Sequence, residues 1–361
     1  RGLWGYAAPM TTATDETAKP MIQARNLTKH FRRPRKQPGL KGALRHLVRP
    51  EYADFTAVDG VDLTIYPGES VAYVGPNGAG KSTTVKLLTG ILVPTAGDIS
   101  VCGLRPFEHR MTNARNIGVV FGQRTQLWWD IPVRESFRLL GDIYEVPPAT
   151  YAATFAELVD VLDLQPLLPV PARQLSLGQR MRCDLAASLI HSPPVLYLDE
   201  PTIVLDVEVK ALFRVFIRYM HDPRGLTVVL TSHDLGDIEE LCERMIMIDK
   251  GTIVYDGALA EVTRRFGWEQ SLHLTLSEPA PDAAATSDGA LARRSGTTVT
   301  QPDDIHLTVT FDSREATSGE LIRDLATAVP ITDIRIEEPS AESIIRKLYE
   351  GSLQFESAVE W

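Results

Sequence analysis

The residues best suited to chemistry form a glycine-rich loop that fits the pattern G-x-x-x-x-G-K-[ST]. The loop and its continuation consist of Gly75, Pro76, Asn77, Gly78, Ala79, Gly80, Lys81, Ser82 and Thr83. Glycines let backbone N–H groups approach phosphate oxygens closely, while Lys81 places a positive charge near the β- and γ-phosphates. The Ser82 hydroxyl is an oxygen ligand of the kind that Mg²⁺ accepts. The loop therefore predicts a site for a nucleoside triphosphate with Mg²⁺.

Four more polar residues stand where apolar runs end. They are Gln123, Asp199, Glu200 and His233. Because the carboxyl ends of parallel strands share one edge of a sheet, a carboxylate such as Asp199 is expected to point toward Mg²⁺. Each residue alone has a structural alternative, since paired acids often cap a helix and a histidine at a strand end is usually structural. A lone glutamine carries no information.

A second loop, residues 175–180 with the sequence LSLGQR, precedes an apolar helical pattern and narrows the class of protein. The chain resembles the ATP-binding-cassette (ABC) ATPases in three features: this segment, the phosphate loop and the order of the polar residues. The resemblance implies that Ser176, Gly178 and Gln179 cap the γ-phosphate bound by a second subunit, so that only a dimer completes the ATP site. Leu177 stands where the family usually has glycine. On its own, the segment is equally consistent with a serine that caps a helix.

The same resemblance implies roles for the polar residues. Glu200 would polarise the attacking water as the base, because phosphoryl transfer needs little more than in-line positioning and charge stabilisation. His233 would contact the γ-phosphate, and Gln123 would sense Mg²⁺ and the water. The implied catalytic set is Glu200, His233, Lys81 and Gln123, and the implied metal set is Ser82, Gln123 and Asp199.

The resemblance leaves open the roles of two further positions. An aromatic ring that stacks on adenine is expected shortly before a strand that begins near Ala57, and the family's spacing favours Tyr52 over Phe55 or Phe31. Packing without a ligand is the alternative for a single ring in a loop. Residues 203–204, Ile-Val, stand where the family has small side chains at the subunit contact, which would couple the two sites differently.

Alternating strand and helix patterns at residues 21–266 predict an α/β P-loop NTPase cassette with a mainly parallel sheet and an antiparallel edge on the N-terminal side. Within it, residues 124–180 are expected to form a helical subdomain. Residues 1–20 are expected to be disordered, and residues 270–361 to form a small C-terminal α+β domain in which residues 277–296 are a flexible excursion. Expected strands are 70–74, 117–122, 195–198, 226–230, 272–276, 305–311 and 333–337, and expected helices are 136–144, 151–162, 321–329 and 341–349.

Two segments are candidates for contact with partners. Residues 32–51 form a basic insertion whose second half has the pattern of an amphipathic helix. This helix is expected either to lie against the inner leaflet or a permease, or to pack on its own domain as a solvated basic loop. Trp128 and Trp129 lie just after Gln123, where the family's permeases dock, and core packing is the alternative for them.

Composition limits the class of protein. The chain has 361 residues, 44% of them apolar and 23% charged, which is typical of a globular protein with a substantial core. Its formal net charge of −10 argues against general affinity for nucleic acid, and no run approaches the ~18 apolar residues of a membrane span. Three cysteines without C-x-x-C spacing suggest reduced thiols rather than zinc or a disulfide framework. Composition therefore predicts a protein that stays in the cytosol, and the resemblance implies a place at the cytoplasmic face of the membrane.

The leading hypothesis is the ATP-hydrolysing subunit of a bacterial exporter, which dimerises around two Mg-ATP and drives permease subunits. Residues 336–344 look like part of the tail domain of daunorubicin-type drug-exporter ATPases. The alternative is an ABC-type ATPase that acts as a mechanical switch on the ribosome or DNA without a membrane partner. A catalytically dead subunit is disfavoured because Lys81, Asp199, Glu200 and His233 are all present.

Overall fold

The computed structural model describes residues 19–34, 52–122, 124–203, 205–221, 225–266, 268–291, 296–337 and 344. The strands are β1 (Ile22–Pro34), β2 (Tyr52–Ile65), β3 (Ser70–Val74), β4 (Ala96–Val101), β5 (Ile117–Phe121), β6 (Val195–Asp199), β7 (Thr227–Thr231), β8 (Arg244–Asp249), β9 (Thr252–Ala258), β10 (Glu269–Leu276), β11 (Thr298–Asp303), β12 (His306–Asp312) and β13 (Ile331–Glu337). The helices are α2 (Lys81–Leu88), α3 (Arg110–Asn116), α4 (Val133–Ile143), α5 (Pro148–Val161), the short 3₁₀ helix η1 (Ala172–Gln174), α6 (Leu177–Leu189), α7 (Val207–His221), α8 (Leu235–Leu241), α9 (Leu259–Phe266), α10 (Ala283–Leu291) and α11 (Ser318–Ala326).

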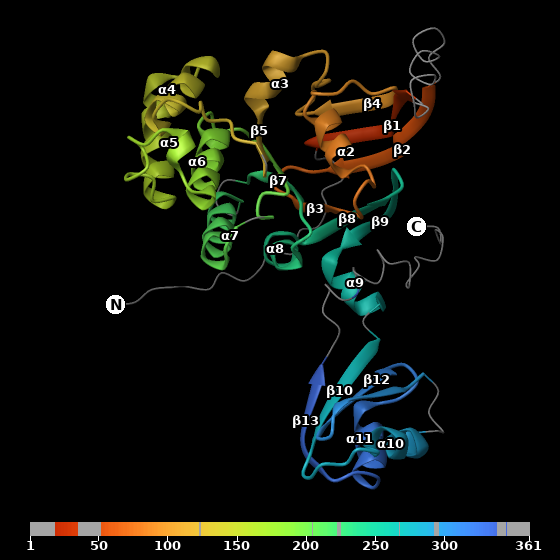
Figure 1. Ribbon diagram of the computed structural model, residues 1–361. Helices are drawn as coiled ribbons and strands as arrows, with labels where there is room; N and C mark the ends of the chain where they lie inside the picture. The colour runs from red at the N-terminus through yellow and green to blue at the C-terminus, as the bar shows by residue number, and fades with distance from the viewer. Residues whose placement is uncertain are drawn as a thin grey trace, which may run out of the picture.

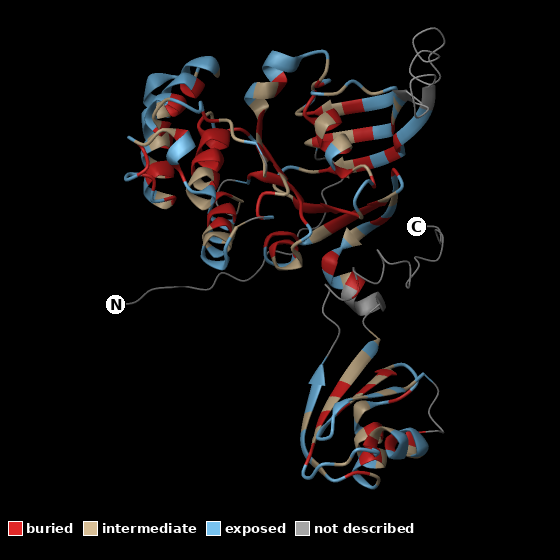
Figure 2. Cartoon of the chain, viewed as in Figure 1, coloured by how far each residue is buried: buried red, intermediate tan, exposed pale blue. Residues whose placement is uncertain are grey.

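A six-stranded sheet with the order β5-β6-β7-β3-β8-β9 forms the centre of the cassette (Figure 1). Its first five strands are parallel, and β9 pairs antiparallel with β8 at the edge. Ala72 and Val74 of β3 belong to the core on the side of α4 to α8, whereas Val71 and Tyr73 belong to the core shared with α2. Both faces of the sheet are therefore covered (Figure 2), which is why β3 and β7 read as continuous apolar runs.

A separate antiparallel sheet, β2-β1-β4, closes the core above α2. Ile22 of β1 pairs with Ile65 on one side and with Val101 on the other. The expectation of a strand that begins near Ala57 is wrong, because pairing with a long β1 extends β2 back to Tyr52. The basic insertion begins as strand, since β1 continues to Pro34, and the helix expected for its second half lies outside the described residues.

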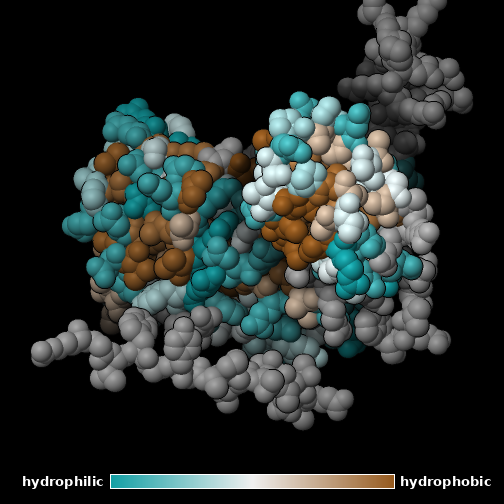
Figure 3. Space-filling view, turned by 90° about the horizontal axis from the view of Figure 1, so that it is seen from below, coloured by the Kyte–Doolittle hydropathy of each residue, from teal (hydrophilic) through white to brown (hydrophobic). Residues whose placement is uncertain are grey.

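The helical part of the cassette contains α4, α5 and α6 (Figure 1). The expected helices at 136–144 and 151–162 are present as α4 and α5, each beginning three residues earlier. The ring of Phe137 in α4 meets that of Phe155 in α5 edge to face, at 6.1 Å between centroids. Figure 3 shows a hydrophobic area on this lobe. Leu139 and Ile143 of α4 are exposed apolar side chains.

A four-stranded antiparallel sheet, β11-β12-β10-β13, carries α10 and α11 and has a hydrophobic core of its own. The expectation of a flexible excursion over residues 277–296 is wrong for α10. Its Ala283, Ser287 and Leu291 are buried, because their spacing of four residues forms one helical stripe that packs into this core. Ile344 belongs instead to the core beneath the six-stranded sheet, and the rest of the helix expected at 341–349 lies outside the described residues.

Among the described residues, no helix combines the length and the apolar character that a membrane span requires. Cys102, Cys183 and Cys242 are free thiols.

Candidate functional site

The phosphate loop follows the carboxyl end of β3, an inner strand that is buried along its whole length. A β-carbon on Gly80 would lie 2.4 Å from the carbonyl oxygen of Ala57, and its φ of 115° favours glycine. A β-carbon on Gly75 would lie 2.1 Å from the carbonyl oxygen of Ile248. No side chain caps the first turn of α2, which begins directly after Gly80. Uncapped backbone N–H groups at a helix N-terminus form a site for an anion such as phosphate.

Lys81, the first residue of α2, is only 7% exposed and points back along the loop. Its Nζ donates a hydrogen bond to the carbonyl oxygen of Gly75 at 2.6 Å and lies 3.4 Å from His233 Nε2. Burial lowers the pKa of Lys81, whereas the carboxylates of Glu200 and Asp199 act against that shift. The lysine is thus held at the loop with two carboxylates nearby.

Asp199, the last residue of β6, joins the phosphate loop to the neighbouring strand β7. Its Oδ1 accepts a hydrogen bond from Thr231 Oγ1 at 2.7 Å and one from Ser82 Oγ at 3.2 Å. This contact is possible because β7 lies between β6 and β3 in the sheet. Ser82 and Asp199 therefore offer two adjacent oxygen ligands, the donor type that Mg²⁺ prefers.

Glu200 follows in a strained backbone conformation, with a φ of 53°. Its N–H donates to the carbonyl oxygen of Thr231 at 3.0 Å and lies 3.1 Å from Thr231 Oγ1. His233 Nε2 is 3.1 Å from the buried Glu200 Oε1, an ion-pair distance without the alignment of a hydrogen bond. Burial raises the pKa of the Glu200 carboxyl, although His233 and Lys81 oppose the shift.

The second loop lies at the N-terminus of α6. Ser176 is the N-cap, its Oγ accepts from the Gln179 N–H at 3.2 Å, and Gln179 Oε1 accepts from the Ser176 N–H at 2.9 Å. This is a capping box. A β-carbon on Gly178 would lie 2.8 Å from Val209 Cγ2 in α7, and Leu177 is 39% exposed. Within the described part of the chain, no hydrogen bond or ion pair links this loop to the phosphate loop.

The structure thus brings five of the expected site residues together at one sheet edge: Lys81, Ser82, Asp199, Glu200 and His233. Tyr52 is the first residue of β2, but its side chain lies outside the described part, as does the whole of Gln123. The roles assigned to these residues stay predictions.

The two tryptophans after Gln123 are partly exposed, Trp128 by 39% and Trp129 by 49%. The Arg180 guanidinium lies 4.8 Å from the centroid of the Trp129 ring. Because Arg180 belongs to α6, the exposed tryptophan segment directly contacts the helix that Ser176 caps.

Sequence reasoning missed two residues that shape this edge. Thr231 holds both Asp199 and the Glu200 N–H, and its only signal is a hydroxyl at the end of an apolar run. Gly122 is the other, because a β-carbon there would lie 1.9 Å from the Glu200 carbonyl oxygen. A glycine directly after a strand gives no sequence signal of that contact.

A phosphate loop beside a strand-end carboxylate pair and a histidine, on a mainly parallel sheet, defines a P-loop ATPase. The family described as "ABC transporter" matches residues 58–203. The daunorubicin resistance ATP-binding protein DrrA3 of Streptomyces coeruleorubidus is 32% identical over 298 residues, which cover 82% of this chain and 92% of that protein. The Nod factor export ATP-binding protein I of Paraburkholderia xenovorans (strain LB400) is 36% identical over 212 residues, or 58% of this chain and 69% of that protein.

Among solved structures, the dimeric ATP-binding cassette MJ0796, in a post-hydrolysis state bound to ADP and Pi, aligns with a TM-score of 0.54 and 25% identity. The alignment covers 66% of this chain and 98% of that one. This chain belongs to the ABC transporter family, as one of its ATP-binding, ATP-hydrolysing proteins. The expected family and fold class are confirmed.

Proposed function

We propose that this chain is the ATPase subunit of a bacterial exporter, working as a dimer on membrane permease subunits at the cytoplasmic face of the membrane. The observation that carries the proposal is the gathering of Lys81, Asp199, Glu200 and His233 at one edge of the sheet. The match to a Nod factor export ATP-binding protein supports export. The match to a daunorubicin resistance ATP-binding protein extends over 298 residues and therefore beyond the cassette.

The phosphates of ATP would lie on the uncapped N-terminus of α2, with the Lys81 ammonium beside the β- and γ-phosphates. Mg²⁺ fits the oxygen pair of Ser82 and Asp199, where it would neutralise charge on the phosphates. Thr231 holds the Asp199 carboxylate in place from β7.

Glu200 would accept the proton of the water that attacks the γ-phosphate. Burial raises the pKa of its carboxyl, which makes the carboxylate a stronger base than an exposed glutamate. His233 lies 3.1 Å from Glu200 Oε1, and we propose that it also contacts the transferred phosphoryl group.

The partner in each site would be a second copy of the chain. Ser176, Gly178 and Gln179 form a helix N-terminus that does not contact the chain's own phosphate loop among the described residues. In an ATP sandwich, these residues of one copy would face the γ-phosphate bound by the other. Because ATP would then touch both copies only in the closed dimer, it shifts the population toward closure, and hydrolysis reverses the shift.

The permeases would dock beside the partly exposed Trp128 and Trp129, of which Trp129 lies next to α6 through its contact with Arg180. Force on this segment would then reach the loop at Ser176. We also retain the proposal of an inner-leaflet contact by residues 32–51. Liposome flotation tests it, because equal binding by wild type and a variant with Lys41, Arg45 and Arg49 changed to Gln would remove it.

The exporter proposal is tested by capturing tagged Glu200→Gln protein from native membranes with Mg-ATP in detergent, followed by mass spectrometry. A stoichiometric polytopic membrane protein is the expected companion. Ribosomal or DNA-repair proteins in its place would favour the alternative, a mechanical switch on those assemblies. Untreated wild type without nucleotide is the control for proteins that bind the resin or the tag.

A further inference from the structure

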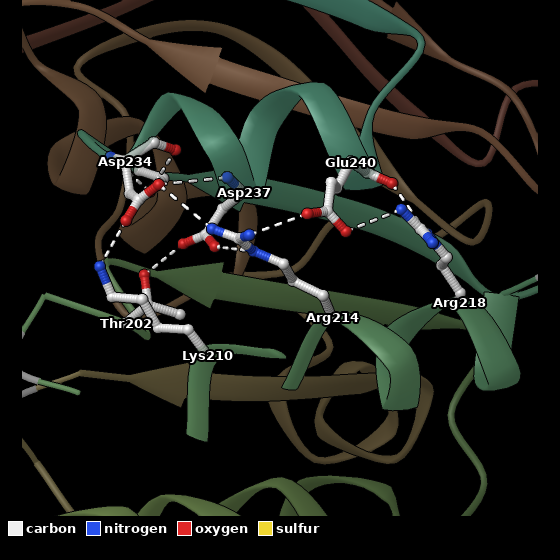
Figure 4. Close-up of polar contacts among 8 residues, drawn as sticks. Thr202, Lys210, Arg214, Arg218, Asp234, Asp237 and Glu240 are labelled. Atoms are coloured by element: carbon white, nitrogen blue, oxygen red, sulfur yellow. Dashed lines mark hydrogen bonds and ion pairs between the residues drawn. The ribbon is translucent and has the colours of Figure 1, made fainter. Parts of the chain in front are cut away.

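Figure 4 shows a charged network that ties α7 to α8, the helix that follows His233. At its centre is Arg214 of α7, whose side chain is 18% exposed. Its Nε donates to Asp237 Oδ1 at 2.6 Å, and its Nη1 to Glu240 Oε1 at 2.8 Å, while Nη2 lies 3.4 Å from Asp234 Oδ1. One guanidinium therefore holds three carboxylates spaced three residues apart along α8.

Asp237 is the innermost of these acids, with a side chain that is fully buried. Its second oxygen, Oδ2, accepts a short hydrogen bond from Thr202 Oγ1, and Thr202 is 1% exposed. A buried carboxylate is tolerated only when it is paired and hydrogen-bonded, and here Arg214 and Thr202 supply one partner for each oxygen. The three side chains thus form a continuous chain from α7 through α8 to Thr202.

Thr202 lies two residues after Glu200, and α8 begins two residues after His233. Residues 200–202 are tied at both ends to the segment 231–237, which contains His233. At one end the Glu200 N–H donates a hydrogen bond to Thr231, and at the other the Thr202 hydroxyl donates one to Asp237. A glutamate with a φ of 53° persists only where its surroundings over-determine it, and these two ties do so.

We propose that Thr202, Asp237 and Arg214 form a positioning unit that fixes the Glu200 carboxylate relative to His233. The inference deepens the proposed function, since it rests on the roles assigned to Glu200 and His233. The contacts of the unit are with protein groups, so it would act without touching nucleotide or water itself. It acts through the loop that carries the base, and so it affects turnover rather than ATP binding.

The charges at the outer end of the network provide a contrast. Asp234 caps α8, and although burial opposes its ionisation, the hydrogen bond and charge of Lys210 hold its pKa below the usual range. Among the described residues, the hydrogen bonds and ion pair of Arg218 go to Glu240, and both side chains are more than 40% exposed. Exposed pairs of this kind contribute little to stability, so Arg218 serves as a matched control.

The test compares steady-state ATPase kinetics of Thr202→Val, Thr202→Ser and Arg218→Gln. Thr202→Val keeps the shape of the side chain and removes the hydroxyl, so we expect kcat to fall ~10-fold to ~100-fold, as small displacements of catalytic groups do, with the KM for ATP within ~2-fold. Thr202→Ser should restore most of kcat, and Arg218→Gln should match the wild type. Unchanged kcat in a folded Thr202→Val protein would overturn the proposal.

A second variant keeps the proposal testable if Thr202→Val does not fold. Arg214→Lys retains one cation beside Asp237 but cannot hold three carboxylates, so kcat should again fall while ATP binding is retained. A fall in kcat with an equal rise in KM would contradict the proposal by indicating general damage to the site. Glu200→Gln distinguishes failure of the proposed function from failure of the positioning unit. If Glu200→Gln retains turnover, the assigned base is wrong. If Glu200→Gln is inactive while Thr202→Val is unimpaired, only the positioning unit is wrong.

Discussion

The N-termini of α2 and α6 are both expected to meet phosphate, yet they are built in opposite ways. α2 begins after Gly80, with no side-chain cap, and its first residue is the buried Lys81. α6 begins after Ser176, which closes a capping box with Gln179. The first is an anion site that one chain forms alone, whereas the second satisfies part of its first turn from within.

This difference indicates which half of the site depends on a partner. The phosphate loop is surrounded by its own Asp199, Glu200 and His233, so the groups proposed to hold the phosphates and to accept the proton all come from one chain. Ser176 uses its hydroxyl oxygen as an acceptor for the Gln179 N–H, which leaves the O–H hydrogen to be donated to a phosphate oxygen. One serine can therefore cap its helix and contact a nucleotide held by another copy.

The largest effect is expected from Gly80→Val, which tests the phosphate site at the N-terminus of α2. The φ of 115° costs a branched residue about 1 to 3 kcal/mol, and its β-carbon would collide with the Ala57 carbonyl oxygen. ATP affinity, measured by calorimetry, should fall at least ~10-fold. The matched control is Gly289→Ala in α10, where a β-carbon meets nothing within 4 Å and binding should stay as in wild type. Normal affinity in Gly80→Val would contradict the role of this loop geometry.

The next effect is the pH dependence of turnover, which tests Glu200, the proposed base beside the phosphate loop. The carboxyl must be ionised to accept a proton, so kcat should fall as the pH drops through its pKa and stay level above it. Because burial raises that pKa, the acid limb should lie at higher pH than for an exposed glutamate. Glu239→Gln, a change of an exposed glutamate on α8, should leave the limb in place. A profile that is flat down to the pH of ordinary glutamate ionisation would argue against Glu200 as the base.

The phosphate loop was predictable because its residue types alone set how closely backbone can approach phosphate. β3, β6 and β7 were also predictable, since strands covered on both faces are continuous apolar runs. Thr231 and Gly122 were not, because their roles arise from strands that are neighbours in the sheet and distant in the sequence.

The charged network was equally hidden from the sequence. Arg214 and Asp237 are ordinary charged residues on two helices, and only the packing of α7 against α8 brings them together. α10 has the composition of a flexible segment, but the four-residue spacing of Ala283, Ser287 and Leu291 lets it pack as a helix. In both cases, tertiary contacts decided what local composition could not.

The smallest effect is expected from Ser176→Ala, which tests whether Ser176 does more than cap α6. Loss of the N-cap should lower the free energy of unfolding by ~1 kcal/mol while ATP affinity of the single chain stays unchanged. Thr317→Ala removes an equivalent capping box from α11 and should cost a similar amount. Turnover should fall in Ser176→Ala but not in Thr317→Ala. Equal turnover in both variants would reduce Ser176 to a helix cap.

The central claim is that ATP joins two copies of this chain, and light scattering coupled to size-exclusion chromatography of Glu200→Gln tests it most directly. With Mg-ATP the variant should elute with the mass of two chains, and with Mg-ADP or with Ser176→Ala added it should elute as one. A single-chain mass with ATP demonstrably bound would contradict the claim, because the phosphate loop would then be occupied without recruiting the α6 N-terminus of a second copy.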